Sequence, residues 1–317
     1  MALPRLMVIG AAKCGTTTLH HDLASNPAFF IPAKQPAHFG HDRILSPAWR
    51  DWYRRLFAGA APGQVCGVVS PMCATRPGVD RVPERARTLL GAELQVVYIV
   101  RDPLERAISH HHDHVRYGDA SVHIDRELVA GSPFVDQSRY AMQLDPWLDT
   151  FGPNNVMVLH FETYVQKRRA TIAELSAWLG VEPHPELVDE TIIHNRGEDV
   201  LVMPWYGMWP PARRLARRLV PERFKQAVRQ FVPRRRTQRS EPSPDTLERV
   251  RALLVEDTAR FHSLLGLEVP LWGQGSRTVL DSALLRPAAR RCAPVGEEKA
   301  SSTEAQHPAA GTTPEPG

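Results

Sequence analysis

Short runs of hydrophobic residues alternate along the chain with segments in which hydrophobic residues recur every three or four positions. The runs cover residues 3–9, 94–100 and 156–160, and each has the length of one buried strand. The periodic segments, such as 140–151 and 172–179, are typical of helices with one hydrophobic face. Strands that are hydrophobic throughout and alternate with helices predict a parallel sheet covered on both faces.

Capping residues mark the ends of several predicted helices. Asp102, Pro103 and Glu105 directly follow the second strand and supply an N-cap, a first helical proline and a third-position glutamate. Gly152 ends the helix that precedes the third strand, and Ser243 begins the last predicted helix.

The composition fits one globular domain with a tail. The chain has 317 residues, of which 43% are hydrophobic and 23% charged, and this excludes a fully disordered chain, a collagen and a coiled coil. Residues 293–317 consist mostly of Ala, Pro, Glu, Thr, Ser and Gly, a composition that cannot build a core. We expect one domain over residues 1–275 and a largely disordered C-terminal extension over residues 276–317.

The cysteines and the hydrophobic runs indicate the cellular compartment of the protein. The four cysteines contain no Cys-x-x-Cys pair, which argues against a disulfide scaffold and a zinc ribbon. No run reaches the about 18 apolar residues that a membrane span needs. The N-terminal run is too short and too weakly charged for a signal peptide. We therefore expect a cytoplasmic protein.

A predicted turn joins the first strand to the first helix. Gly10 and Gly15 have the spacing of a phosphate-binding loop, in which backbone N–H groups and the positive end of a helix surround an anion. Nucleotide triphosphatases place a lysine and a hydroxyl residue directly after the second glycine, for the phosphates and for magnesium. Here Thr16 and Thr17 follow, and Lys13 lies inside the loop. The loop therefore predicts binding of a phosphate-like group without metal-dependent triphosphate chemistry.

A second candidate phosphate site follows the second strand. Arg101 ends that strand, and its guanidinium can donate two hydrogen bonds to one phosphate. Ser109 comes eight residues later, about two turns into the next helix, and so faces roughly the same side. An arginine and a hydroxyl placed in this way can hold one dianion. The alternative is that Arg101 pairs with Asp102 or Glu105 and that Ser109 only packs.

Both segments resemble motifs of one enzyme family. Residues 13–19 (KCGTTTL) resemble the 5′-phosphosulfate loop of sulfotransferases that use 3′-phosphoadenosine-5′-phosphosulfate (PAPS), and residues 98–110 (YIVRDPLERAISH) resemble their 3′-phosphate motif. The resemblance covers about residues 4–272 and is to the heparan-sulfate and bacterial branch. It implies a P-loop-like three-layer α/β fold, with a central parallel sheet flanked by helices. It also implies in-line transfer of a sulfuryl group from PAPS to a hydroxyl or amine, which releases 3′-phosphoadenosine-5′-phosphate (PAP).

The resemblance also implies a role for each residue of the two motifs. Lys13 would be catalytic, neutralising the leaving phosphate as the bond from sulfur to oxygen breaks. Arg101 and Ser109 would hold the 3′-phosphate and so select PAPS over ATP. The residues that would hold the 5′-phosphosulfate are Lys13, Cys14, Gly15, Thr16, Thr17 and Thr18. The family chemistry requires no metal.

The proton acceptor departs from the family pattern. A Lys-Glu-Pro segment supplies a glutamate base in relatives, whereas residues 34–36 read Lys-Gln-Pro here, and an amide cannot accept the proton. His38 is the first candidate for the base, because a neutral imidazole accepts a proton near neutral pH. His41 and Asp42 are its rivals. Val68 replaces a second familial glutamate.

Four histidines crowd the helix that follows the second strand. His110 and His114 have the spacing of a metal-binding pair, but the sequence indicates no third ligand, so we expect no metal site. The alternatives are that these histidines line the acceptor site or form a solvated face.

Positive charge is concentrated in one late segment. The net charge is +4, yet eleven basic residues and one acidic residue lie between Arg213 and Arg239. This pattern predicts a local anionic partner and no nucleic acid. Four interpretations of the segment are open. It could contact the cofactor's 3′-phosphate, or it could attract an anionic acceptor. It could also contact a membrane surface through residues 205–239, or form a solvated lid helix. The acceptor is expected to be a small molecule, a lipid or a glycan.

Two other functions compete with sulfuryl transfer. A P-loop nucleotide kinase would depend on ATP and magnesium, and the missing Lys-Ser/Thr pair after Gly15 argues against it. A non-catalytic relative would bind the nucleotide without turnover, and Gln35 and Val68 are the residues that favour this alternative.

Overall fold

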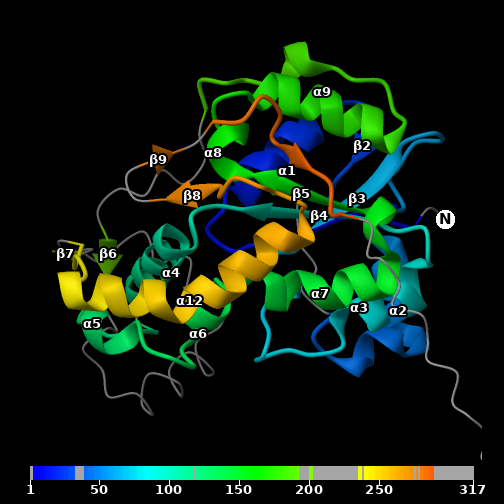
Figure 1. Cartoon of the computed structure of the whole chain (residues 1–317). Helices are drawn as coiled ribbons and strands as arrows, with labels where there is room; N and C mark the ends of the chain where they lie inside the picture. The colour runs from blue at the N-terminus through cyan, green and yellow to red at the C-terminus, as the bar shows by residue number, and fades with distance from the viewer. Residues whose placement is uncertain are drawn as a thin grey trace, which may run out of the picture.

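A six-stranded sheet forms the centre of the protein (Figure 1). The computed structural model describes residues 3–32, 39–117, 119–192, 200–202, 235–237, 239–273, 276–277 and 279–288. The strands lie in the order β10-β5-β4-β1-β3-β2, and neighbours are parallel except β10 with β5. Their bounds are β1 Leu6–Gly10, β2 Phe29–Phe30, β3 Val65–Val69, β4 Gln95–Val100, β5 Val156–His160 and β10 Leu284–Leu285.

Helices cover both faces of the sheet. Figure 1 shows α1 and α9 on one face and α3, α7 and α12 on the other. The longer helices are α1 Thr16–Ser25, α2 Pro47–Arg55, α3 Val82–Leu90, α4 Pro103–Tyr117, α7 Tyr140–Phe151, α9 Arg168–Leu179 and α12 Pro244–Leu264. The expected three-layer α/β fold is therefore confirmed.

Short elements connect these layers. The short helices are α5 Ile124–Glu127, α6 Pro133–Asp136 and α8 Phe161–Tyr164, with 3₁₀ turns at Asp42–Leu45, Pro71–Cys73, Pro153–Asn155 and Pro185–Leu187. Two antiparallel ribbons pair β6 Val200–Val202 with β7 Arg235–Thr237, and β8 Trp272–Gly273 with β9 Ser276–Arg277. None of the helices in the described ranges is long and apolar enough to cross a membrane.

The strands are buried because they are hydrophobic on both faces. Every residue of β1, β3 and β5 is buried. Removing one such side chain from water stabilises the fold by about 1.5–3 kcal/mol. Since β1, β3, β4 and β5 are parallel, their carboxyl ends lie at one edge of the sheet, where ligands of open α/β sheets bind. The segments that follow these strands therefore meet there.

The sheet contains three strands that the hydrophobic runs did not predict. β2 and β10 have two residues each, and β3 contains a glycine at position 67, which weakens a strand pattern. β10 comes from the segment 276–317 and pairs Leu284 with Leu159 of β5. The residues from 289 onward lie outside the described part of the chain.

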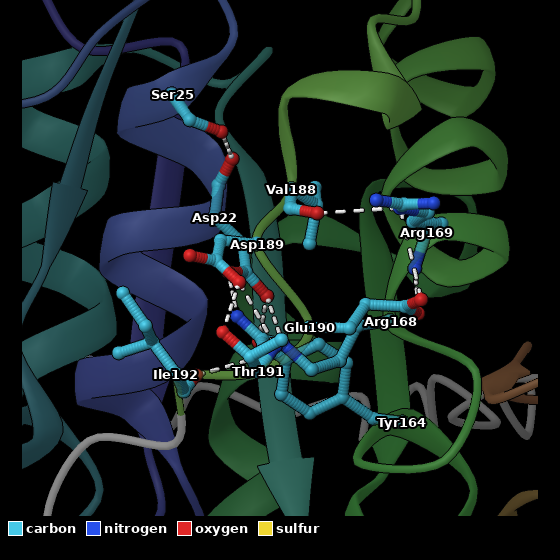
Figure 2. Close-up of polar contacts among 10 residues, drawn as sticks. All are labelled: Asp22, Ser25, Tyr164, Arg168, Arg169, Val188, Asp189, Glu190, Thr191 and Ile192. Atoms are coloured by element: carbon cyan, nitrogen blue, oxygen red, sulfur yellow. Dashed lines mark hydrogen bonds and ion pairs between the residues drawn. The ribbon is translucent and has the colours of Figure 1, made fainter.

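A buried ion pair joins α1 to α9 (Figure 2). Arg168 donates hydrogen bonds to both carboxylate oxygens of Asp22, and the two side chains are 2% and 3% exposed. The Tyr164 hydroxyl donates to the same carboxylate over 2.6 Å, and Arg168 Nη1 donates to the carbonyl of Ile192 over 2.8 Å. Because both charges are hydrogen-bonded, the pair can hold α9 against the helix that begins at the phosphate-type loop.

Replacing Arg168 by methionine is expected to lower the free energy of unfolding by about 3–5 kcal/mol, because the Asp22 carboxylate then stays buried without its charge partner. The double variant Asp22→Leu/Arg168→Met removes both charges and is expected to recover most of that loss. Urea unfolding followed by circular dichroism measures both values. Arg169→Met is the matched control, since that neighbouring side chain is 54% exposed. A double variant no more stable than the single one would contradict this role.

Candidate active site

The loop between β1 and α1 has a left-handed backbone at two critical positions. Lys13 and Gly15 have φ angles of 73° and 82°, and Gly15 is the N-cap of α1. A Cβ atom at Gly15 would lie 2.7 Å from Cε2 of Phe161, so no side chain fits there. The first turn of α1 carries no acidic residue. The first amides of a helix have no partner within that helix and favour an anion, so the loop has the geometry of an anion site.

The predicted loop residues differ in how much of their surface is exposed to solvent. Cys14 is buried, its thiol lies 3.7 Å from Oη of Tyr140, and burial raises the pKa of Cys14 to about 11. Its amide donates to the loop carbonyl three residues earlier over 3.2 Å. Thr16 and Thr18 are buried, whereas Thr17 is half-buried. The Cys14 side chain therefore packs into the core beneath the loop.

Lys13 contacts an aspartate that the sequence analysis missed. Its Nζ atom lies 2.9 Å from Oδ1 of Asp113, and the two side chains keep 26% and 29% of their surface exposed. Asp113 lies on α4, one turn after Ser109. The spacing of Ser109 and Asp113 on one helix face was visible in the sequence, but nothing local linked that face to the loop.

Arg101 lies beside the loop. Its Nη1 donates to the carbonyl of Lys13 over 3.5 Å, and its Nη2 donates to Oε2 of Glu105 over 3.3 Å. The guanidinium lies 5.3 Å from the centre of the Phe161 ring. Ser109 is half-buried on α4, the helix that begins two residues after Arg101. The structure thus brings Lys13 and Arg101 together, and it also shows the Arg101–Glu105 pair that the sequence left as an alternative.

An unpaired donor and a concentration of positive charge make this edge of the sheet fit a polyanion. Within the described ranges, Nε of Arg101 is buried and has no hydrogen-bond partner. A buried donor without a partner is costly, and a ligand oxygen would remove that cost. The same guanidinium contacts the backbone carbonyl of Lys13, in the loop that leads into the positive end of α1. The residues present therefore fit a ligand with more than one phosphate-like group.

Glu162 fixes the segment that carries Arg101. Its Oε1 accepts a hydrogen bond from the amide of Asp102 over 2.9 Å, and its Oε2 accepts one from Nε1 of Trp272 over 3.4 Å. The same Oε2 lies 3.1 Å from Nε2 of His160, whose pKa is lowered by burial. Asp102 in turn caps α4, as the sequence predicted, by accepting from the amide of Glu105 over 2.9 Å. The ends of β4 and β5 are therefore tied together.

Arg106 is a buried cation behind the site that sequence reasoning missed. It is 0% exposed, and burial lowers its pKa. Its Nε donates to Oγ of Ser138 and its Nη2 to the carbonyl of Phe134, both over 2.6 Å. Its Nη1 has no partner in the described part of the chain. Arg106 thus ties α4 to α6 and adds a third positive charge near the loop.

The four histidines of α4 pack against neighbouring side chains. His110, His111 and His112 are buried, and the rings of His110 and His114 pack edge-on at 4.7 Å between centres. Burial, aided by the nearby Arg106 charge, lowers the pKa of His110 to about 2, so this ring is neutral at physiological pH. Among the described residues there is no group of three or more side chains that could hold a metal.

Several predicted residues lie outside the described part of the chain. They include His38, Gln35 and most of the basic segment between Arg213 and Arg239. Of the two rivals of His38, Asp42 accepts a hydrogen bond from Nε of Arg85 over 2.7 Å, and this contact lowers the pKa of Asp42. His41 precedes the 3₁₀ turn that Asp42 begins and is exposed.

Comparison with curated proteins identifies heparan sulfate enzymes as relatives. Heparan sulfate glucosamine 3-O-sulfotransferase 5 from Mus musculus is 32% identical over 107 residues, which are 34% of this chain and 30% of that protein. Bifunctional heparan sulfate N-deacetylase/N-sulfotransferase 3 from Homo sapiens is 24% identical over 201 residues, which are 57% of this chain and 23% of that protein. The chain therefore spans less than a third of the length of each of these relatives.

Comparison with solved structures and family models agrees with these relatives. A sulfotransferase from Alicyclobacillus acidocaldarius has a TM-score of 0.59 at 21% identity, over 86% of this chain and 99% of that chain, and so shares the fold. The family model described as a sulfotransferase domain matches residues 3–198, more than half of the chain. The match includes both the loop and the Arg101 segment. The protein therefore belongs to the sulfotransferase family.

Proposed function

We propose that this enzyme transfers the sulfuryl group of PAPS to a hydroxyl or amine and releases PAP. The observation that carries the proposal is the contact between the two motifs, in which Arg101 Nη1 lies 3.5 Å from the Lys13 carbonyl at the positive end of α1. PAPS carries phosphate-like groups at both of its ends, and two adjacent cationic groups suit such a ligand.

The two motifs divide the donor between them. The amides of the first turn of α1, with Gly15 and the threonines at 16–18, hold the 5′-phosphosulfate, and Cys14 holds the loop in shape from below. Arg101 and Ser109 hold the 3′-phosphate, which ATP lacks. The unpaired Nε of Arg101 supports this assignment, because it supplies a further donor for a phosphate oxygen.

The protein contributes position and charge to the reaction. PAPS supplies a sulfuryl group joined to a phosphate that leaves readily once its charge is neutralised. Lys13 donates a hydrogen bond to the oxygen that leaves sulfur and stabilises the charge that develops there. The loop and Arg101 hold the donor in one orientation, so that an acceptor meets the sulfur in line.

The kinase alternative is not favoured. The chain belongs to the sulfotransferase family, and Thr16 stands where a triphosphatase needs its phosphate-binding lysine. A non-catalytic relative would bind PAP without turnover, so transfer of radiolabelled sulfate separates it from the enzyme.

The acceptor class defines the first screen. The curated relatives are named for N- and 3-O-sulfation of heparan sulfate, and this puts glycans with free amines and hydroxyls first. Lipids and small hydroxylated compounds come next. A thermal-shift screen with PAP bound selects compounds, and transfer from radiolabelled PAPS tests each of them.

We place the enzyme in the cytoplasm, where thiols stay reduced. Cys14, Cys66 and Cys73 are free and buried, which suits a reducing compartment. The basic segment between Arg213 and Arg239 keeps its proposed role as a contact for an anionic acceptor, for the 3′-phosphate or for a membrane surface.

Calorimetry with PAP and with magnesium–ADP tests the donor. We expect PAP to bind at least about tenfold more tightly, because only PAP has a 3′-phosphate for Arg101. Arg101→Ala is expected to weaken PAP binding about 10- to 100-fold, since charge-assisted hydrogen bonds contribute about 1.5–3 kcal/mol each. Arg54→Ala, an exposed arginine of α2, is the control. Binding of magnesium–ADP as tight as that of PAP would favour a kinase.

Gly15→Ala tests the loop as the anion site. The substitution strains a left-handed residue and drives Cβ into Phe161, so we expect PAP binding to fall at least about tenfold. Gly63→Ala is the matched control, because Gly63 has a φ of 87° but nothing within 4 Å of its Cβ position. Backbone strain should cost each variant about 1–2 kcal/mol of stability, and the contact with Phe161 should make the loss larger in Gly15→Ala, both measured by thermal unfolding. A folded Gly15→Ala variant that binds PAP like the wild type would contradict this assignment.

A further inference from the structure

Asp113 occupies a position that the proposed function does not yet use. Its Oδ1 lies 2.9 Å from Nζ of Lys13, the lysine expected at the oxygen that leaves sulfur. It stands four residues after Ser109 on α4, so both side chains project from the same face of that helix. Asp113 is thus a carboxylate beside the reacting end of the donor.

The other carboxylates near the loop already have structural partners. Glu105 pairs with Arg101, and Asp102 caps α4. Glu162 contacts an amide, an indole and an imidazole through its two oxygens. Asp42 is held by Arg85. Among the described residues, Asp113 alone combines contact with Lys13 and a second carboxylate oxygen without a partner.

The contact between Asp113 and Lys13 can be replaced by a contact between Lys13 and the donor. Both side chains are more than a quarter exposed, and partly exposed ion pairs are weak because water solvates each charge. When Lys13 donates to a donor phosphate instead, Asp113 keeps its position on α4 but no longer shares that ammonium. A carboxylate then faces the space beside the sulfur that an acceptor must enter.

We propose that Asp113 is the general base of the transfer. It takes the role that the resemblance assigns to a glutamate at position 35, where this chain has a glutamine. The proposal rests on the proposed function. Asp113 accepts the proton of the acceptor O–H or N–H as the acceptor atom bonds to sulfur. The bond from sulfur to the bridging oxygen breaks, its electron pair stays on the phosphate of PAP, and Lys13 donates a hydrogen bond to that oxygen. The charge that leaves with PAP is balanced by the proton that Asp113 holds.

The test needs no known acceptor. Water can replace the acceptor, and its attack on sulfur requires the same removal of a proton. The probe is radiolabelled PAPS alone, with enzyme and donor at similar concentrations, and the readouts are sulfate release and PAP affinity by calorimetry. Asp113→Asn is expected to lower sulfate release about 100-fold, the usual contribution of a general base, while PAP binds at least as tightly as to the wild type.

Four further variants separate a base from a structural residue. Asp113→Glu is expected to recover part of the rate, and added formate is expected to raise the rate of Asp113→Ala, because a free carboxylate can replace the missing one. Glu248→Gln removes an exposed carboxylate of α12 and is expected to change neither readout. His38→Gln tests the histidine that the sequence favours.

Each outcome decides between the alternatives. A wild-type rate no higher than in buffer, an unchanged rate in Asp113→Asn, or a loss confined to His38→Gln would overturn the role of Asp113. Loss of PAP binding in Asp113→Asn would show a positioning role in place of catalysis. Failure of the wild type to bind PAP would instead overturn the proposed function and is seen before any rate is measured.

Discussion

The balance of charge around the loop is the constraint on which the site depends. Lys13 and Arg101 place two positive charges beside the positive end of α1, and Arg106 adds a third one behind them. Like charges at this range repel, and burial makes the repulsion stronger. Asp113 and Glu105 relieve it through pairs that stay partly exposed. Such pairs are strong enough to keep the cations in place and weak enough to yield to a ligand phosphate.

Helix α4 links this charge balance to the core. Its inward face buries Arg106 and three histidines, and its N-terminus is fixed by Asp102 and Glu162. Ser109 and Asp113 are half-buried and lie on the same side of α4 as Arg106, one and two turns further along the helix. The buried histidines remain neutral, so they pack as rings and add no further positive charge to the site. A single helix therefore sets the distance between Ser109 and the carboxylate beside Lys13.

The sequence predicted what local patterns encode. The hydrophobic runs gave β1, β4 and β5, and the cap at Asp102 gave the start of α4, because each depends on residues close together in the chain. The loop motif likewise depends only on neighbouring positions. The contacts of Lys13 with Asp113 and of Asp22 with Arg168 join residues 100 or more positions apart, and no local pattern marks them. β10 was not predicted because a strand of two residues is too short to show a hydrophobic pattern. Its position in the sheet is set by its pairing with β5.

The position of β10 has a consequence for biosynthesis. β5, which leads into Glu162, has β4 on one side, and its other side is covered only when Leu284 and Leu285 emerge from the ribosome. Until then the growing chain displays an unpaired strand edge, which is a template for association with other chains. Ribosome stalling or premature termination before this strand would therefore yield an aggregation-prone product even though the loop and the Arg101 segment had already been synthesised.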